Sequence, residues 1–339
     1  LAVIFGLLFP PLGQIAGYLA WPFAAFTIRA VEFFAQFPAG TLALGTLSLP
    51  AVLFFYLLVI GWTIASARVK QAASALKPSL ALLILASLTV MTWRAAVSAP
   101  DLHLHVTLLD VGDGDGLLVE TPSGRSLLID GGPSASRLSD ALGRRLPFTQ
   151  RELDYLVIAA AGEGQLGALP RLMERFPIER ALWAGPTHGT YAARQLQEQL
   201  NLGGVLVETA QAGQTLDLGQ GARLEVLCSG KRGAVLLVEW GYFRLLLPIG
   251  IDFDDFEKLE NGRSIGPVTA LLLAEGGYAP ANPPEWIVNL HPQLILLSVD
   301  AQNWRGLPSA ETMEAVEGYP VLRTDRNGWI HIETDGDRM

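Results

Sequence analysis

The pattern of apolar and polar positions changes near residue 100. Residues 1–100 contain long apolar runs with few polar interruptions, whereas residues 101–339 alternate short apolar runs with polar turns. About 20 consecutive apolar residues can cross a bilayer, and short alternating runs are typical of strands and amphipathic helices. The pattern therefore predicts membrane helices over residues 1–100 and a globular α/β domain over residues 101–339.

Three stretches of the first part are apolar enough to cross a bilayer. They are residues 1–21, 48–67 and 79–93. The segment 22–40 carries two charges on one helical face, so we expect it to lie at the membrane interface. We therefore expect a multi-pass protein of the cell membrane.

The loop between the last two expected spans indicates the orientation of the chain. It contains Arg68, Lys70 and Lys77. Loops rich in lysine and arginine stay on the cytoplasmic side of a membrane. The span that follows then runs outward, and we expect residues 101–339 to be extracytoplasmic.

The order of elements in the globular part suggests two similar halves. Apolar runs joined by short turns predict antiparallel strands first, followed by strands that alternate with helices, and this order occurs twice. Asn327 and Gly328 suit a type I′ turn, which predicts a closing hairpin over residues 323–334. Such a pattern favours two mixed sheets packed face to face, with helices outside.

The net charge of the globular part bears on whether it binds nucleic acid. Five of the 24 basic and one of the 33 acidic residues lie in residues 1–100, which leaves 19 basic and 32 acidic residues and a net charge of −13 beyond residue 100. That charge argues against direct DNA binding, which depends on neutralising phosphates. A basic strip remains as an alternative nucleic-acid surface. It comprises Arg144, Arg145, Arg151 and Arg171.

The single cysteine, Cys228, excludes an intrachain disulfide and a thiolate metal cluster. It ends an apolar strand, so we expect a buried and inert thiol.

The stretch "LLDVGDGDGLLVETPSGRSLLIDGG", residues 108–132, resembles the start of the metallo-β-lactamase-like domain of the ComEC family of DNA-internalisation competence proteins. "AVEFFAQFPAG" and "LPAVLFFYLL" resemble the end of that family's channel domain, and "SVDAQNWRGLPSAETMEAV" and "VLRTDRNGWIHIETDG" resemble its closing segments. The resemblance covers essentially the whole chain. It implies a metallo-β-lactamase-like αββα sandwich over residues 101–339, preceded by transmembrane helices over residues 1–100.

The resemblance also implies a place in natural transformation. In the family, the channel carries single-stranded DNA across the membrane, and the attached domain degrades the other strand with bound metal. The expected partners are the membrane, DNA that is reached through the attached channel, and other DNA-uptake proteins.

The metal-binding motifs of the family, here called stations, fall at four places in this chain where almost no ligand side chains are present. The family pattern His-x-His/Asp-x-Asp-His falls on "AAGEGQ", Thr-Gly-Asp falls on "PIG", His-His-Gly falls on "AEGG", and Gly-His-Pro falls on "GLP". The residues at the ligand places are Ala160, Gly162, Gly164, Gln165, Gly250, Glu275, Gly276 and Leu307. The side chains of alanine, glycine and leucine offer no lone pair, and an amide is a poor ligand for transition metals. Only Glu275 places a carboxylate at one of these positions. We therefore expect no metal, no cofactor and no catalytic residue at these stations.

Acidic residues remain near the expected strand ends, and with Gln165 they define a vestigial pocket. Its expected members are Asp110, Asp113, Asp115, Asp130, Glu163, Gln165 and Glu275. They could hold a hard cation, and they could equally be turn residues that cap local amides. The sequence thus predicts a catalytically inactive, structural or partner-docking domain. The alternative is a metal-dependent hydrolase or nuclease that uses these unusual carboxylate ligands.

His103 and His105 alternate on a strand, so their imidazoles point to one face. Such a pair can begin a metal site, but no third ligand lies near it in the sequence. We expect a solvated strand here.

Overall fold

The computed structural model describes residues 85–90, 101–146, 150, 152–186 and 190–338. By its internal contacts the chain divides into two units, Leu1–Ala99 and Pro100–Met339. Residues 85–90 are helical, and the rest of the expected membrane segment lies outside the described residues. Among the described residues, no helix has both the length and the apolar character needed to cross a bilayer.

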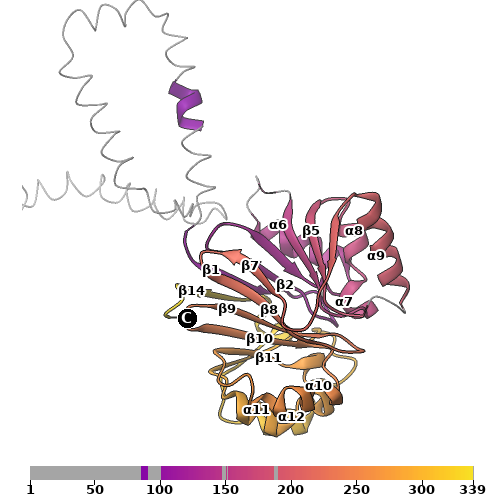
Figure 1. Ribbon diagram of the computed structural model, residues 1–339, viewed down its shortest axis with the longest axis vertical. Coiled ribbons are helices and arrows are strands. Elements are labelled where there is room, and N and C mark those ends of the chain that lie inside the picture. Colours follow the sequence, from indigo (N-terminus) through magenta and orange to yellow (C-terminus); the bar gives the residue numbers. More distant parts are fainter. Residues whose placement is uncertain (1–84, 91–100, 147–149, 151, 187–189, 339) are drawn as a thin grey trace, which may run out of the picture. The chain divides into compact units, whose positions relative to one another are not determined.

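The second unit contains two seven-stranded mixed sheets (Figure 1). In the first sheet the strand order is β14-β1-β2-β3-β4-β5-β6. Its strands are β1 (Leu104–Leu108), β2 (Leu117–Glu120), β3 (Ser126–Ile129), β4 (Leu153–Ile158), β5 (Ile178–Trp183), β6 (Leu206–Thr209) and β14 (Ile330–Thr334). The strands from β14 to β3 pair antiparallel, and those from β3 to β6 pair parallel.

The second sheet repeats this plan in the order β13-β12-β11-β10-β9-β8-β7. Its strands are β7 (Thr215–Gly219), β8 (Ala222–Ser229), β9 (Ala234–Trp240), β10 (Phe243–Ile249), β11 (Ala270–Leu272), β12 (Leu294–Leu297) and β13 (Val321–Arg323). Strands β7 to β10 pair antiparallel, and β10 to β13 pair parallel. The expected order of hairpins followed by alternating strands and helices, repeated once, is confirmed.

Helices cover the outer face of each sheet (Figure 1). On the first sheet they are α6 (Ala135–Arg145), α7 (Glu163–Leu166), α8 (Leu169–Leu172) and α9 (Tyr191–Leu202). On the second sheet they are α10 (Phe253–Lys258), α11 (Pro284–Leu290) and α12 (Ala310–Ala315), while the short α13 (Thr324–Asn327) precedes β14. This is the αββα sandwich that the sequence predicted.

Local chemistry explains where the two long helices begin and which face they bury. Ser134 caps α6 by accepting a hydrogen bond from the Arg137 amide, and Thr190 caps α9 through the Ala193 amide. A cap of this kind satisfies an amide that lacks a partner within the helix. Leucines four residues apart in α6 and α9 then bury one face of each helix against the first sheet.

Three apolar layers hold the sandwich together. One layer lies between the two sheets, and the others lie between each sheet and its helices. The alternation in β1, and in β8 as far as Val226, directs every second side chain into the central layer. After the register shift in β8, Cys228 lies in the outer layer of the second sheet. Strands β9 to β12 are buried on both faces, which accounts for their nearly continuous apolar runs.

The expected closing hairpin is wrong. Strand β13 ends at Arg323 in the second sheet, and β14 begins at Ile330 in the first. Residues Thr324–Asn327 form one helical turn between them, because the chain must cross from one sheet to the other. Gly328, with φ of +68°, ends that turn.

The central apolar layer provides a test of the packing. Leu247 on β10 is fully buried there, so Leu247→Ala should lower the free energy of unfolding by about 2–5 kcal/mol through lost burial and a cavity. Leu202, at the end of α9, is 76 % exposed, so Leu202→Ala should change it by less than about 0.5 kcal/mol. Chemical denaturation followed by tryptophan fluorescence measures both variants. Equal effects would contradict the central layer.

Candidate functional site

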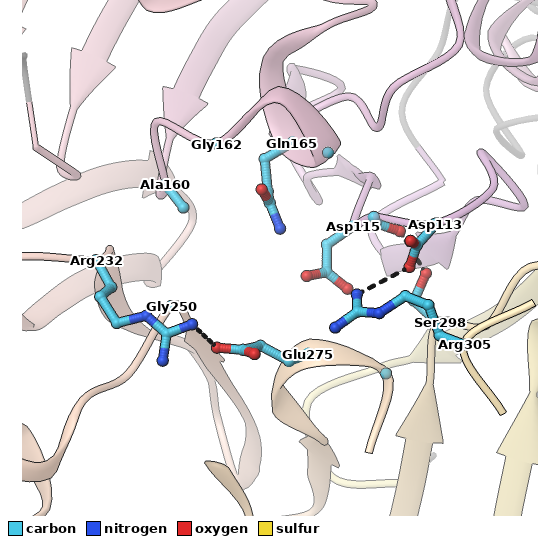
Figure 2. Close-up of a pocket in the computed structure, with 13 residues that line it drawn as sticks. Asp113, Asp115, Ala160, Gly162, Gln165, Arg232, Gly250, Glu275, Ser298 and Arg305 are labelled. Atoms are coloured by element: carbon cyan, nitrogen blue, oxygen red, sulfur yellow. Dashed lines mark hydrogen bonds and ion pairs between the residues drawn. The ribbon is translucent and has the colours of Figure 1, made fainter. Parts of the chain in front are cut away.

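A pocket of about 470 Å³ lies where strands of the two sheets end. The β1–β2 loop, the segments that follow β4, β10, β11 and β12, and the β8–β9 turn surround it (Figure 2). Its lining residues are Asp113, Gly114, Asp115, Ala160, Gly162, Gly164, Gln165, Arg232, Gly250, Glu275, Gly276, Ser298 and Arg305. Loops at the carboxyl ends of strands are the usual place for binding and chemistry in open α/β sheets.

The structure brings most of the family's metal stations together. Those at Ala160, Gly162, Gln165, Gly250 and Glu275 line the pocket (Figure 2). Gly164 and Gly276 line it as well. The Leu307 station does not line it, because its side chain is buried beside a smaller neighbouring hollow. The stations therefore lie around one pocket, although their side chains carry few ligand atoms.

Close backbone approach explains two glycines of the site. A Cβ at Gly114 would overlap the carbonyl oxygen of Gly164, because the β1–β2 loop lies directly against the turn after β4. Gly250 has φ of +73°, and a Cβ there would lie 2.7 Å from the Arg232 carbonyl oxygen. Ser298 fixes the same region by donating its hydroxyl to the Gly114 carbonyl at 2.6 Å. The pocket wall thus requires small residues.

Two arginines neutralise acids in the pocket, and the sequence analysis missed both. Arg232, from the β8–β9 turn, forms an ion pair with Glu275 (Figure 2). Arg305 forms another with Asp113 at 3.3 Å between Nη1 and Oδ1. Arg232 and Glu275 both come from the second sheet, on the β8–β9 turn and after β11, whereas Arg305 and Asp113 come from different sheets. In both pairs the partners lie far apart in the sequence, so local patterns do not reveal them.

Asp115 is the most perturbed acid that lines the pocket. Burial raises the pKa of its carboxyl to about 7, and the negative charges of Asp113 and Glu275 add to the shift. A carboxyl with such a pKa titrates near neutral pH, where it can give up or accept a proton.

Three members of the expected vestigial pocket lie apart from it. Asp130 is fully buried behind the wall, where its Oδ1 accepts the Ala159 amide at 2.8 Å and burial raises its pKa. Glu163 accepts the Ala192 amide at the start of α9. Asp110 lies in a different hollow, where its Oδ1 is 3.9 Å from Nη1 of Arg137. Burial raises the pKa of the Asp110 carboxyl, and the positive charge of Arg137 opposes this shift. The turn and capping roles describe Asp130 and Glu163 better than a shared site does.

The residues that line the pocket do not suit the bound metal that the sequence resemblance implies. Its stations offer one amide, from Gln165, and one carboxylate, from Glu275, and the carboxylates of Glu275 and Asp113 are already paired with arginines. Within the described part of the chain, groups of three or more His, Cys, Asp or Glu donors within 4.8 Å of one another occur on β1, just before β1 and on β14, and none includes a pocket residue. The positive charges among the residues that line the pocket are the guanidinium groups of Arg232 and Arg305.

The basic strip is only partly described. Arg144 and Arg145 end α6, and Arg171 lies in α8. The guanidinium carbon of Arg145 lies 3.0 Å from the ring centroid of Trp329. Arg151 lies outside the described residues.

No family model matches the sequence, and no curated protein matches it. Solved structures with a similar backbone include the metallo-β-lactamase fold protein YhfI from Bacillus subtilis, at 15 % identity with a TM-score of 0.46, covering 68 % of this chain and 99 % of YhfI. Zn²⁺-bound PqqB from Methylobacterium extorquens, at 10 % identity and TM-score 0.47, covers 68 % of this chain and 100 % of its own.

A third similar structure is described as that of a metal-dependent hydrolase from Parabacteroides distasonis. It has 11 % identity and a TM-score of 0.42, and the match covers 66 % of this chain and 94 % of that chain. These scores are too low to carry an argument. The assignment of the αββα fold therefore depends on the strand order and layers described above.

The raised pKa of Asp115 predicts a pH-dependent stability. The folded state holds the proton more tightly than the unfolded chain, whose pKa is 3.8, so this contribution is complete below pH 3.8 and is lost as pH rises through about 7. Three pKa units correspond to about 4 kcal/mol. Asp115→Asn should match the unmodified protein near pH 4 and exceed its unfolding free energy by about 2–4 kcal/mol at pH 8. Denaturation at both pH values measures the difference, and parallel pH profiles would contradict it.

Proposed function

We propose that residues 101–339 form a non-catalytic metallo-β-lactamase-like domain that serves as a structural or partner-docking module. The observation that carries the proposal is the replacement of metal ligands by Ala160, Gly162, Gly164 and Gly250, together with the arginine–carboxylate pairs in the same pocket. The fold is retained, and its loops still form a shaped surface.

The chemistry of guanidinium groups supports this proposal. A bound metal lowers the pKa of a water ligand and so makes a nucleophile at neutral pH. Arginine stabilises negative charge, but it remains protonated in proteins and binds no hydroxide in that way. The pairs of Arg232 with Glu275 and Arg305 with Asp113 therefore replace the metal charge without replacing the metal's reaction.

The setting of the domain is a further part of the proposal. The motifs in residues 108–132 and the apolar stretches of residues 1–100 support a chain that is the C-terminal part of a ComEC-family membrane protein of DNA uptake. The domain then lies outside the cytoplasm, attached to a multi-pass channel. DNA is an indirect partner, reached only through the attached channel. The domain docks other DNA-uptake proteins, and the pocket holds no cofactor.

A hydrolase with unusual ligands is the second candidate. Asp113, Asp115 and Glu275 border one pocket, and the pKa of Asp115, about 7, suits general acid–base catalysis. This reading requires the arginine pairs to open so that the two flanking carboxylates become free.

A nuclease assay separates the two candidates. The full chain, incubated with Mn²⁺, Mg²⁺ or Zn²⁺ and labelled single- or double-stranded DNA, should cleave no more DNA than buffer with the same metal. Asp115→Asn should give the same background, because no reaction passes through Asp115. Metal-dependent cleavage that disappears in Asp115→Asn would replace the docking proposal with the second candidate.

The proposed orientation can be tested with one introduced thiol. Cys228 is buried, and burial raises its pKa to about 12, so the native thiol should react slowly. Leu202→Cys places a thiol at an exposed helix end. A membrane-impermeant maleimide should label this variant in intact cells, or in spheroplasts if an outer membrane is present, while leaving the parent chain unlabelled. Labelling that requires lysis would contradict an extracytoplasmic domain.

A further inference from the structure

Strands β1 and β14 bring histidines from opposite ends of the domain together. They pair antiparallel, with His105 opposite Glu333 and Thr107 opposite His331. These four side chains share the face of the first sheet that points away from the central apolar layer, because Leu104, Val106 and Leu108 occupy that layer. The sequence around His105 indicated no third ligand. The further donors therefore come from β14, more than 200 positions later in the chain.

Each of the two imidazoles is held through one ring nitrogen. Nε2 of His105 lies 2.6 Å from Asp101 Oδ2, and Nδ1 of His331 lies 2.9 Å from the Thr107 hydroxyl. Metal-binding histidines commonly have this support, in which a carboxylate or another oxygen accepts from the nitrogen that does not bind metal. The remaining nitrogens, Nδ1 of His105 and Nε2 of His331, face each other at 3.3 Å.

This nitrogen–nitrogen separation suits a shared metal ion. Two nitrogens bound to one tetrahedral Zn²⁺ at 2.0–2.1 Å lie about 3.3–3.4 Å apart. A carboxylate oxygen of Glu333 completes a set of three donors that all lie within 4.8 Å of one another. The cluster therefore has the donors and the spacing of a three-ligand site before any ion is added.

The surrounding charges favour a cation. Asp101 and Glu333 contribute carboxylates, and Glu120 on β2 lies opposite His105 in the strand register. Arg145, which stacks on Trp329, is the opposing charge near this group. Glu333 is about half exposed, so water can reach a fourth coordination position.

We propose that His105 Nδ1, His331 Nε2 and the Glu333 carboxylate bind one divalent transition-metal ion, with Zn²⁺ as the type ion and water as the fourth ligand. Asp101 and Thr107 are positioning residues that orient the two imidazoles. Imidazole and carboxylate donors select this class of ion over Ca²⁺ and Mg²⁺, which prefer oxygen ligands alone. The bound ion would join the first strand of the domain to the last. The site is separate from the pocket and does not depend on the proposed function.

Calorimetric titration of Zn²⁺ into the full, untagged chain tests the site. We expect one equivalent to bind at this cluster, with His105→Gln or His331→Gln lowering the affinity by about 100-fold or more. Asp101→Asn and Thr107→Val should each lower it by about 10- to 100-fold, as is typical for residues that orient a ligand.

Two matched controls should retain full affinity for Zn²⁺. His291→Asn removes an imidazole from the end of α11, where the left-handed backbone suits asparagine, and Asp115→Asn alters the pocket.

A measurement on the unmodified protein avoids dependence on variant folding. One equivalent of Cu²⁺ should give an electron paramagnetic resonance spectrum with hyperfine coupling from two imidazole nitrogens. A spectrum without nitrogen coupling, an absence of Zn²⁺ binding at micromolar concentrations, or binding that survives both histidine variants would overturn the proposal. Loss of binding in Asp115→Asn alone would instead place the metal in the pocket, and that result would contradict the proposed function.

Discussion

The apolar layer between the two sheets is the constraint on which the site depends. Side chains from both sheets fill this layer, so the ends of β4, β10, β11 and β12 are held beside one another. The position of the pocket is therefore a consequence of packing, while its wall depends on small residues such as Gly114 and Gly250. Dense apolar packing explains how loops that carry alanine and glycine, with few large side chains, still surround a defined pocket.

Charge balance in the pocket follows from the same enclosure. Three acids lie close together in a partly buried space, where uncompensated negative charge is costly. Arg232 and Arg305 compensate two of them, and the most buried acid, Asp115, responds by holding its proton to higher pH. The arrangement is self-contained, in contrast to a metal centre that is complete only after ions bind.

The sequence predicted features that are written in local patterns. Alternating apolar positions located the strands, and the order of hairpins and helices predicted the two mixed sheets. It did not predict contacts that arise only when distant segments meet. Arg232, in the β8–β9 turn, pairs with Glu275, which follows β11. His331 lies beside His105 because the last strand pairs with the first. The closing hairpin failed because a turn signal such as Asn327-Gly328 does not reveal to which sheet the next strand belongs.

The pairing of β1 with β14 determines how the domain would respond to mechanical tension. In the antiparallel register Leu104 lies opposite Thr334. The start of β1 and the end of β14 are therefore at the same end of this strand pair (Figure 1). Force applied between those ends would open the interstrand hydrogen bonds one after another, starting at Leu104 and Thr334, and would not load them all together. Resistance to pulling would then be low at this seam, even though the layers behind it are tightly packed.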